Sequence, residues 1–266
     1  MHITITGNLG SGKSTICKLL NEKYQFEIYS TGKVQRELAR QMNLTTLELN
    51  QLMCNDHQYD NMIDDTTAKI SRENPDKDII FDSRLAWHFV EHSFKVFISV
   101  SLEEAAERVM NDTRGAEEKY TSLEEAKKLL AERASTEKIR YKDIYNLNYM
   151  DFSNYNLVID STFCTPDKIA EIIYKEAKAF EKEHSKSVSK MLVSPKRLLK
   201  EIDIGEEDIK KLQSLIEEYK KIPDAIDTAI KVKQQEDNYV VSEGLDLAKA
   251  AFLAGVPYTP IEVIKY

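Results

Sequence analysis

Residues Gly7-Asn8-Leu9-Gly10-Ser11-Gly12-Lys13-Ser14 fit the phosphate-binding pattern G-x-x-x-x-G-K-[ST]. The motif lies between a strand pattern over 3–6 and a helix pattern over 15–23, which is the context that its mechanism requires. Glycines let the backbone curl so that successive N–H groups point at a phosphate, and the N-terminus of the following helix adds positive partial charge. We therefore expect a phosphate-binding loop at the start of an α/β domain.

Each residue type in this loop has an expected task. Lys13 should reach the β- and γ-phosphate oxygens of a nucleotide, and the Ser14 hydroxyl should ligate Mg²⁺. The positions expected to contact the bound nucleotide are Gly7, Gly10, Ser11, Gly12, Lys13, Ser14 and Thr15. The loop predicts a nucleotide but no particular reaction, because GTPases, motor ATPases, transporters and kinases all use it.

Strand and helix patterns alternate through residues 1–180. The expected strands are 3–6, 26–29, 78–82, 95–100 and 156–160, and the expected helices are 15–23, 32–42, 46–53, 57–73 and 166–181. Strands separated by helices indicate right-handed crossovers and a parallel sheet, and apolar strands such as Ile79-Ile80-Phe81 indicate that helices cover both faces. We predict one α/β domain over residues 1–180.

The remaining sequence is predicted to form a separate, smaller α+β domain. Residues 181–190 are polar and almost free of apolar side chains, which is typical of a linker. Within 191–266 the patterns predict helices over 206–219 and 245–253 and strands over 229–232, 238–241 and 261–264.

Two further groups of residues are expected beside the phosphate loop. Asp82-Ser83-Arg84 follows an apolar strand, so its carboxylate and guanidinium should lie at the sheet edge where ligands collect. Asp82 would hold Mg²⁺ through water, and Arg84 would grip an acceptor phosphate or base. Arg36 follows Ser30-Thr31-Gly32 at the start of a helix and could direct a cation at a second phosphate group. The plainer alternatives are a surface ion pair and a solvated helical arginine.

A charged segment between residues 108 and 140 supplies more guanidinium groups. Arg133 and Arg140 are seven residues apart and therefore share a helical face. Phosphoryl transfer spreads negative charge over the γ-phosphate oxygens, which an arginine-bearing lid would stabilise while it excludes water. The alternative is an exposed helix whose charges face solvent.

The composition narrows the possible binding partners and the cellular compartment. The formal net charge of −8 argues against non-specific nucleic-acid binding. Three widely spaced cysteines form no metal or disulfide framework, which fits a reducing cytoplasm. No apolar stretch approaches the ~20 residues of a membrane span, and the first residues lack a basic start, a long apolar middle and a small-residue cleavage site, so we do not expect secretion. We expect a cytoplasmic protein with a small-molecule substrate and leave the oligomeric state open.

These motifs together resemble the cytidylate kinase family of nucleoside monophosphate kinases, especially its short archaeal-type branch, over residues 1–180. Besides the phosphate loop, the matching stretches are Ser30-Thr31-Gly32 with Arg36-Glu37-Leu38-Ala39, Asp82-Ser83-Arg84-Leu85-Ala86-Trp87, Arg140-Tyr141-Lys142-Asp143-Ile144-Tyr145 and Leu157-Val158-Ile159-Asp160-Ser161-Thr162. Their order and spacing are more specific than the phosphate loop alone.

The resemblance implies a five-stranded parallel sheet, an acceptor-binding region near 31–73 and a lid near 110–142. It implies MgATP as the phosphate donor and CMP or dCMP as the acceptor. Arg36 and Arg84, with Thr31 and Gly32, would bind the acceptor. The catalytic cations would be Lys13, Arg114, Arg133 and Arg140.

Three departures leave the acceptor open. Ser83 stands where the family usually has glycine, Lys33 stands where an acidic or small residue is common, and 145–148 lacks the usual Tyr-Gly-Ile-Asp pattern.

Residues 191–266 faintly resemble the ParB/sulfiredoxin-like fold, but Leu247 stands where that family's phosphate-binding arginine would be. The competing interpretations are a kinase for another small acceptor and a nucleotide-binding regulatory or partner-binding protein.

Overall fold

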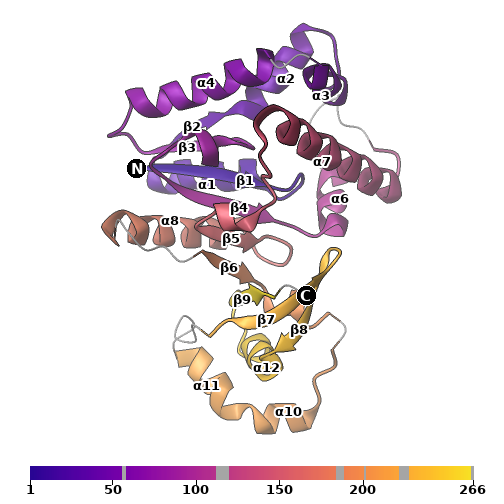
Figure 1. Cartoon of the computed structure of the whole chain (residues 1–266). Helices are drawn as coiled ribbons and strands as arrows, with labels where there is room; N and C mark the ends of the chain where they lie inside the picture. The colour runs from indigo at the N-terminus through magenta and orange to yellow at the C-terminus, as the bar shows by residue number, and fades with distance from the viewer. Residues whose placement is uncertain (56–57, 112–119, 184–188, 201, 222–227, 265–266) are drawn as a thin grey trace.

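The computed structural model describes residues 1–266 except 56–57, 112–119, 184–188, 201, 222–227 and 265–266 (Figure 1). Its first part contains the five expected strands, which are β1 (His2–Gly7), β2 (Glu27–Ser30), β3 (Ile79–Asp82), β4 (Ser93–Ser99) and β5 (Leu157–Asp160). They pair in parallel in the order β2-β3-β1-β4-β5, so the predicted α/β class and the five-stranded parallel core are confirmed.

Helices connect these strands. Their bounds are α1 (Lys13–Tyr24), α2 (Thr31–Gln41), α3 (Thr46–Asn55), α4 (Gln58–Glu73), α5 (Ala86–Phe89), α6 (Leu102–Asn111), α7 (Leu123–Tyr145) and α8 (Pro166–Glu183), with a 3₁₀ turn at Phe152–Asn154. Most of the long helix α7 thus falls within the expected lid region near 110–142. Residues 112–119 of that region lie outside the described residues.

Successive side chains along each strand point to opposite faces of the sheet, so a hydrophobic core forms on each face. On one face, Ile3 and Ile5 of β1 pack with Ile16 of α1 and Ile173 of α8. On the other face, Phe97 of β4 belongs to a second cluster beneath α5 and α7. Burial of both faces explains why these parallel strands read as nearly continuous apolar runs.

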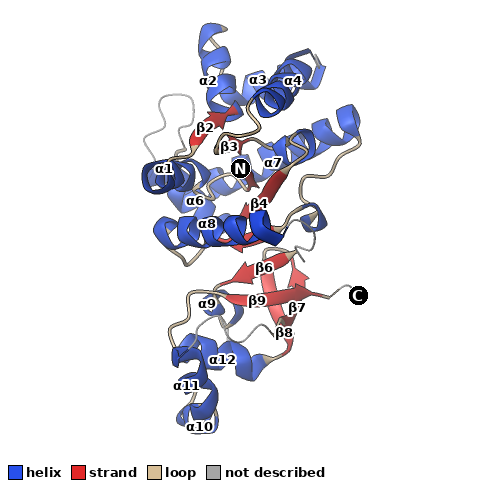
Figure 2. Cartoon of the chain, turned by 90° about the vertical axis from the view of Figure 1, so that its left-hand side faces the viewer, coloured by secondary structure: helices blue, strands red, loops and turns tan. Residues whose placement is uncertain are grey.

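The sheet does not stop at β5. β6 (Lys190–Val193) adds a further parallel strand, and β9 (Thr259–Val263) pairs with β6 in the antiparallel direction. β7 (Ile230–Gln235) and β8 (Asn238–Glu243) complete the order β5-β6-β9-β7-β8, which continues downward in Figure 2. The C-terminal part is therefore joined to the first part by a continuous ladder of strands.

Two expectations about this C-terminal part need correction. The polar stretch 181–190 is not wholly irregular, because α8 extends to Glu183 and β6 begins at Lys190. The single helix expected over 206–219 is divided into α10 (Glu206–Lys211) and α11 (Gln213–Lys221), because the backbone leaves helical geometry at the buried Leu212. Short helices α9 (Pro195–Leu198) and α12 (Leu245–Leu253) complete the part.

Candidate active site

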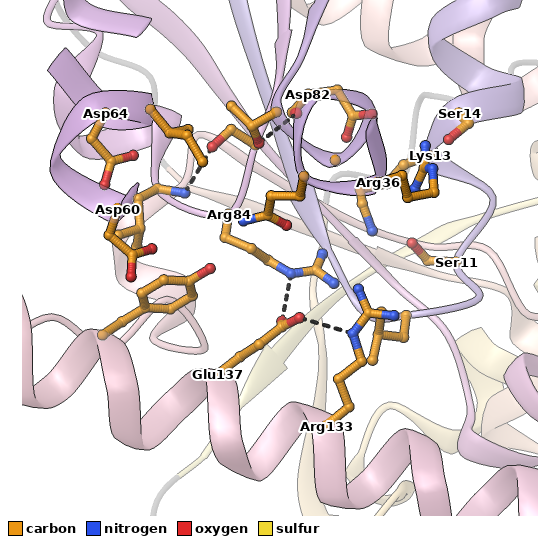
Figure 3. A pocket seen from close by; sticks show the side chains of 18 of the residues that line it. Ser11, Lys13, Ser14, Arg36, Asp60, Asp64, Asp82, Arg84, Arg133 and Glu137 are labelled. Carbon is orange, nitrogen blue, oxygen red and sulfur yellow. Dashed lines mark hydrogen bonds and ion pairs between the residues drawn. The ribbon is translucent and has the colours of Figure 1, made fainter. Parts of the chain in front are cut away.

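Parallel pairing brings the carboxyl ends of β1 and β3 to one edge of the sheet, where Ile5 of β1 lies opposite Asp82 of β3. The loop after β1 and the residues after β3 therefore face a common space, as expected for ligand sites in open α/β sheets. A cavity at this edge is lined by residues of the phosphate loop, α2, α4, the β3–α5 turn and α7 (Figure 3). No helix in the described part of the chain combines the length and hydrophobicity that a bilayer span requires.

The phosphate loop depends on glycine at two points. Gly10 has a φ of 74°, and a Cβ there would lie 2.8 Å from the Ala105 carbonyl oxygen, so α6 packs directly against the loop. Gly12 has a φ of 82° and caps α1, which begins at Lys13. The first amides of α1 thus lie at the loop, which is the geometry of an anion-binding helix N-terminus.

The Lys13 ammonium group lies over its own loop. Its Nζ donates to the carbonyl oxygens of Gly7 at 3.1 Å and Asn8 at 2.9 Å. Burial, with a smaller contribution from the nearby Arg84 cation, lowers the pKa of Lys13 to about 7. An anionic ligand in the cavity would favour the charged form of this lysine.

Ser14 and Asp82 line the same cavity and could hold a divalent cation. Asp82 accepts a hydrogen bond from Ser30 Oγ at 2.9 Å, and its backbone carbonyl accepts one from Thr31 Oγ1 at 3.4 Å. A serine hydroxyl and a carboxylate are oxygen donors of the kind that Mg²⁺ takes, usually with several waters retained. The residues present therefore fit Mg²⁺ bound partly through water.

Two arginines of the cavity share one carboxylate. Arg84 Nε donates to Glu137 Oε2 at 2.7 Å, and Arg133 Nε donates to Glu137 Oε1 at 3.2 Å (Figure 3). Burial raises the pKa of Glu137, but the two guanidinium groups outweigh it and lower that pKa to about 2. Arg84 also donates to the Gly7 carbonyl at 2.6 Å. Glu137 thus fixes two cations close to the phosphate loop.

The α2 residues expected to bind the acceptor lie in the same cavity. Thr31, Gly32 and Arg36 line it, and Arg36 has no ion-pair partner within the described ranges. Asp60 and Asp64 of α4 line it as well. In Figure 3, Asp60 and Asp64 therefore lie on the side of the cavity farther from Ser11, Lys13 and Ser14 of the phosphate loop.

Of the remaining predicted positions, several lie outside this cavity. Gly7 contributes its carbonyl oxygen to Lys13 and Arg84, and Thr15 lines an adjoining hollow with Arg108. Arg140, expected to be a lid cation, is 2% exposed and pairs with Asp60 at 3.5 Å. It is absent from the cavity lining, because its position on α7 faces α4. Arg114 lies outside the described residues.

Sequence reasoning did not identify Glu137, Asp60 or Asp64. Glu137 could have been found, because it follows Arg133 by four residues and so lies on the same face of one helix. The two aspartates carried no comparable signal, since a helix of this composition is equally compatible with a solvated face.

Comparison with known proteins identifies the family of this chain. The cytidylate kinase-like family model matches residues 2–162, more than half of the chain. A cytidylate kinase from Natronomonas pharaonis is 34% identical over 182 residues, covering 68% of this chain and 91% of the relative. The cytidylate kinase of Methanosarcina mazei is 37% identical over 166 residues, covering 60% and 87%.

A solved structure of an uncharacterized protein from Eubacterium ventriosum shares the fold, with a TM-score of 0.51 and 18% identity, covering 67% of this chain and 99% of that one. The family match includes the phosphate loop, Asp82 and Arg84, and Glu137. It ends before β6, so the C-terminal strands lie beyond it. The chain therefore belongs to the cytidylate kinase-like family of enzymes.

Proposed function

We propose that the protein transfers the γ-phosphate of ATP to a nucleoside monophosphate, with CMP or dCMP as the favoured acceptor, and releases ADP and the nucleoside diphosphate. The observation that carries this proposal is the pairing of a phosphate loop with the Arg36, Arg84 and Arg133 cations in one cavity. Two groups of phosphate-binding residues facing each other suit two phosphorylated ligands. The names of the cytidylate kinase relatives support the choice of acceptor.

In this proposal, ATP phosphates lie on the loop amides and on Lys13. Arg84 and Arg36 hold the acceptor phosphate, while Arg133 stabilises charge on the transferred group. Bound Mg²⁺, held by Ser14 and through water by Asp82, would neutralise phosphate charge. The acceptor phosphate oxygen is already nucleophilic, so alignment and charge stabilisation are sufficient and no general base is needed.

We propose that this activity belongs to residues 1–180 and that residues 191–266 form an additional module. The carboxylates of Asp60 and Asp64 lie on the acceptor side, away from the phosphate loop, where a base with an exocyclic amino group would find hydrogen-bond acceptors. This chemistry favours cytosine over uracil, which presents a carbonyl oxygen at the corresponding position.

The test is ADP release measured across all ribo- and deoxyribonucleoside monophosphates, with shikimate and serine as non-nucleotide acceptors. We expect the highest kcat/KM with CMP or dCMP. Lys13→Ala should reduce turnover by roughly 10²- to 10³-fold because it removes a phosphate-stabilising cation. Product formation only with a non-nucleotide acceptor would overturn the proposed acceptor class, and ATP binding without any transfer would overturn the kinase assignment.

A further inference from the structure

The C-terminal part (β6 to β9, residues 190–263) contacts the catalytic part (β1 to α8, residues 2–183) at the ends of β4 and β5, next to the phosphate loop. The contact begins with Arg197 of α9, which is 7% exposed and lies over the Tyr239 ring at 5.0 Å from its centroid. Its Nη1 pairs with the Asp160 carboxylate and donates to Thr162 Oγ1 at 3.1 Å. Its Nη2 donates to the Asp237 carbonyl oxygen at 2.7 Å. The buried guanidinium of Arg197 thus joins α9 to the turn after β5 and to the β7–β8 turn.

Asp160 is fully buried at the end of β5 and anchors the turn that follows. It accepts from Ser99 Oγ at 2.9 Å and from the Thr162 amide at 3.1 Å. Thr162 Oγ1 in turn accepts from the Ser101 amide at 3.0 Å. Since an ionised carboxylate without a paired cation is costly in such a site, Arg197 stabilises the turns after both β4 and β5.

A second contact comes from the β7–β8 turn, which lies below α6 in Figure 1. The Asp237 carboxylate accepts a hydrogen bond from the Leu102 amide at 2.8 Å. Leu102 is the first residue of α6, so Asp237 supplies a carboxylate to an amide that has no partner within its helix. The C-terminal part therefore fixes the start of α6.

α6 carries this contact to the donor side of the site. Ala105 packs against Gly10 of the phosphate loop. One turn further on, Arg108 donates to the Ser161 carbonyl oxygen at 2.7 Å and to Ser161 Oγ at 3.1 Å. Arg108, Gly10 and Pro166 line a hollow that shares Gly10 and Gly12 of the phosphate loop with the main cavity but does not include Arg84. A nucleoside attached to phosphates on the loop would occupy this hollow.

We propose that Arg197 and Asp237 are positioning residues for the donor nucleotide: the C-terminal module holds α6 and the turn after β5 in the arrangement that binds ATP. Neither residue lines the hollow, so each acts through the backbone segments that it bonds. The cavity residues on the acceptor side belong to α2, α4 and α7, none of which is bonded by Arg197 or Asp237 in the described contacts. The inference rests on the proposed function only in taking ATP as the donor.

The test uses the full chain with Arg197→Met, Arg197→Lys and Asp237→Ala, and measures the Kd for ATP, the KM of each substrate and the unliganded Tm. Lys211→Met is the control, because Lys211 pairs with Asp246 at an exposed site inside the module. For Arg197→Met we expect the Kd for ATP to rise roughly tenfold while the acceptor KM changes by less than about twofold. Arg197→Lys should restore part of the affinity.

Asp237→Ala keeps the test decisive if Arg197→Met fails to fold, because the Asp237 side chain is 46% exposed and its loss should be tolerated. We expect it to weaken ATP binding roughly threefold and the control to leave it unchanged. An unchanged Kd for ATP in folded variants would overturn the inference, as would a parallel loss of donor and acceptor binding with a lower Tm. Failure of phosphate transfer in the unaltered protein would overturn the proposed function alone, since ATP binding is measured directly.

Discussion

Arg84 and Glu137 are joined by a 2.7 Å hydrogen bond that ties the turn after β3 to helix α7. Arg84 also bonds the Gly7 carbonyl at the start of the phosphate loop. Because Arg133 pairs with the same carboxylate, the position of one glutamate determines where two cations lie. In the proposed function, the two guanidinium groups assigned to phosphates are therefore held by a carboxylate that need not touch a phosphate.

Glu137→Gln removes the shared charge while retaining the side-chain volume. We expect a loss of stability on the order of 3 kcal/mol and a raised acceptor KM, because two partly buried guanidinium groups lose their carboxylate. Chemical denaturation and initial-rate kinetics measure these effects. Glu132→Gln, at an exposed position of the same helix, is the control.

The pH dependence of that stability loss has a definite sign. The pKa of Glu137 is lowered to about 2, so its contribution is fully present above the unfolded value of ~4.3. The difference in stability between the unaltered protein and Glu137→Gln should stay constant from pH 7 to 5 and shrink as pH falls from about 4 toward 2. A difference that grows on acidification would contradict the assigned ion pairs.

The lowered pKa of Lys13 predicts that ATP binding is coupled to proton uptake. Its pKa of about 7 leaves it largely neutral at pH 8 in the free protein, and bound phosphates should raise that pKa. ATP binding at pH 8 should therefore take up protons, and ATP affinity should fall as pH rises above about 7. Calorimetry in buffers with different ionisation enthalpies measures the uptake. Lys13→Arg stays charged in both states, so the same uptake in that variant would refute the assignment to Lys13.

Arg133 and Arg140 should differ in what their loss affects. Arg133 lines the cavity, so Arg133→Met should lower kcat by roughly 10- to 100-fold with a modest change in stability. Arg140 is buried against Asp60, so Arg140→Met should cost on the order of 3 kcal/mol of stability. Thermal denaturation and kcat, measured for both variants, separate these roles. A large loss of kcat in a stable Arg140→Met protein would instead support Arg140 as a catalytic cation.

Asp64 predicts a second pH effect. Burial, opposed by a hydrogen bond from Tyr145 and aided by the nearby Asp60 charge, raises its pKa to about 7. The folded protein then binds more protons than the unfolded chain between about pH 4 and 7, so this group makes stability fall as pH rises through that window. Asp64→Asn should remove the fall, whereas the exposed neighbour Asp65→Asn should leave it in place. Equal stability-against-pH curves for Asp64→Asn and the unaltered protein would show that Asp64 titrates normally.

Local patterns were sufficient for most of the catalytic part. The five strands, the loop before α1 and the α2 residues all follow from period, glycine positions and polar residues at strand ends. β6 was not predicted, because four residues after a polar stretch carry too little periodicity to identify a strand. The break between α10 and α11 was missed for a related reason: one apolar stripe continues across it.

The order of residues along the chain determined the phosphate loop, its lysine and the parallel sheet, because these depend on local backbone geometry and on contacts that repeat at fixed spacing. Tertiary structure alone decided the partners of the buried charges. It assigned Glu137 to Arg84 and Arg133, Asp60 to Arg140, and Arg197 to Asp160. Such pairings join segments far apart in the chain, and their energies depend on burial and distance, which only the folded arrangement defines.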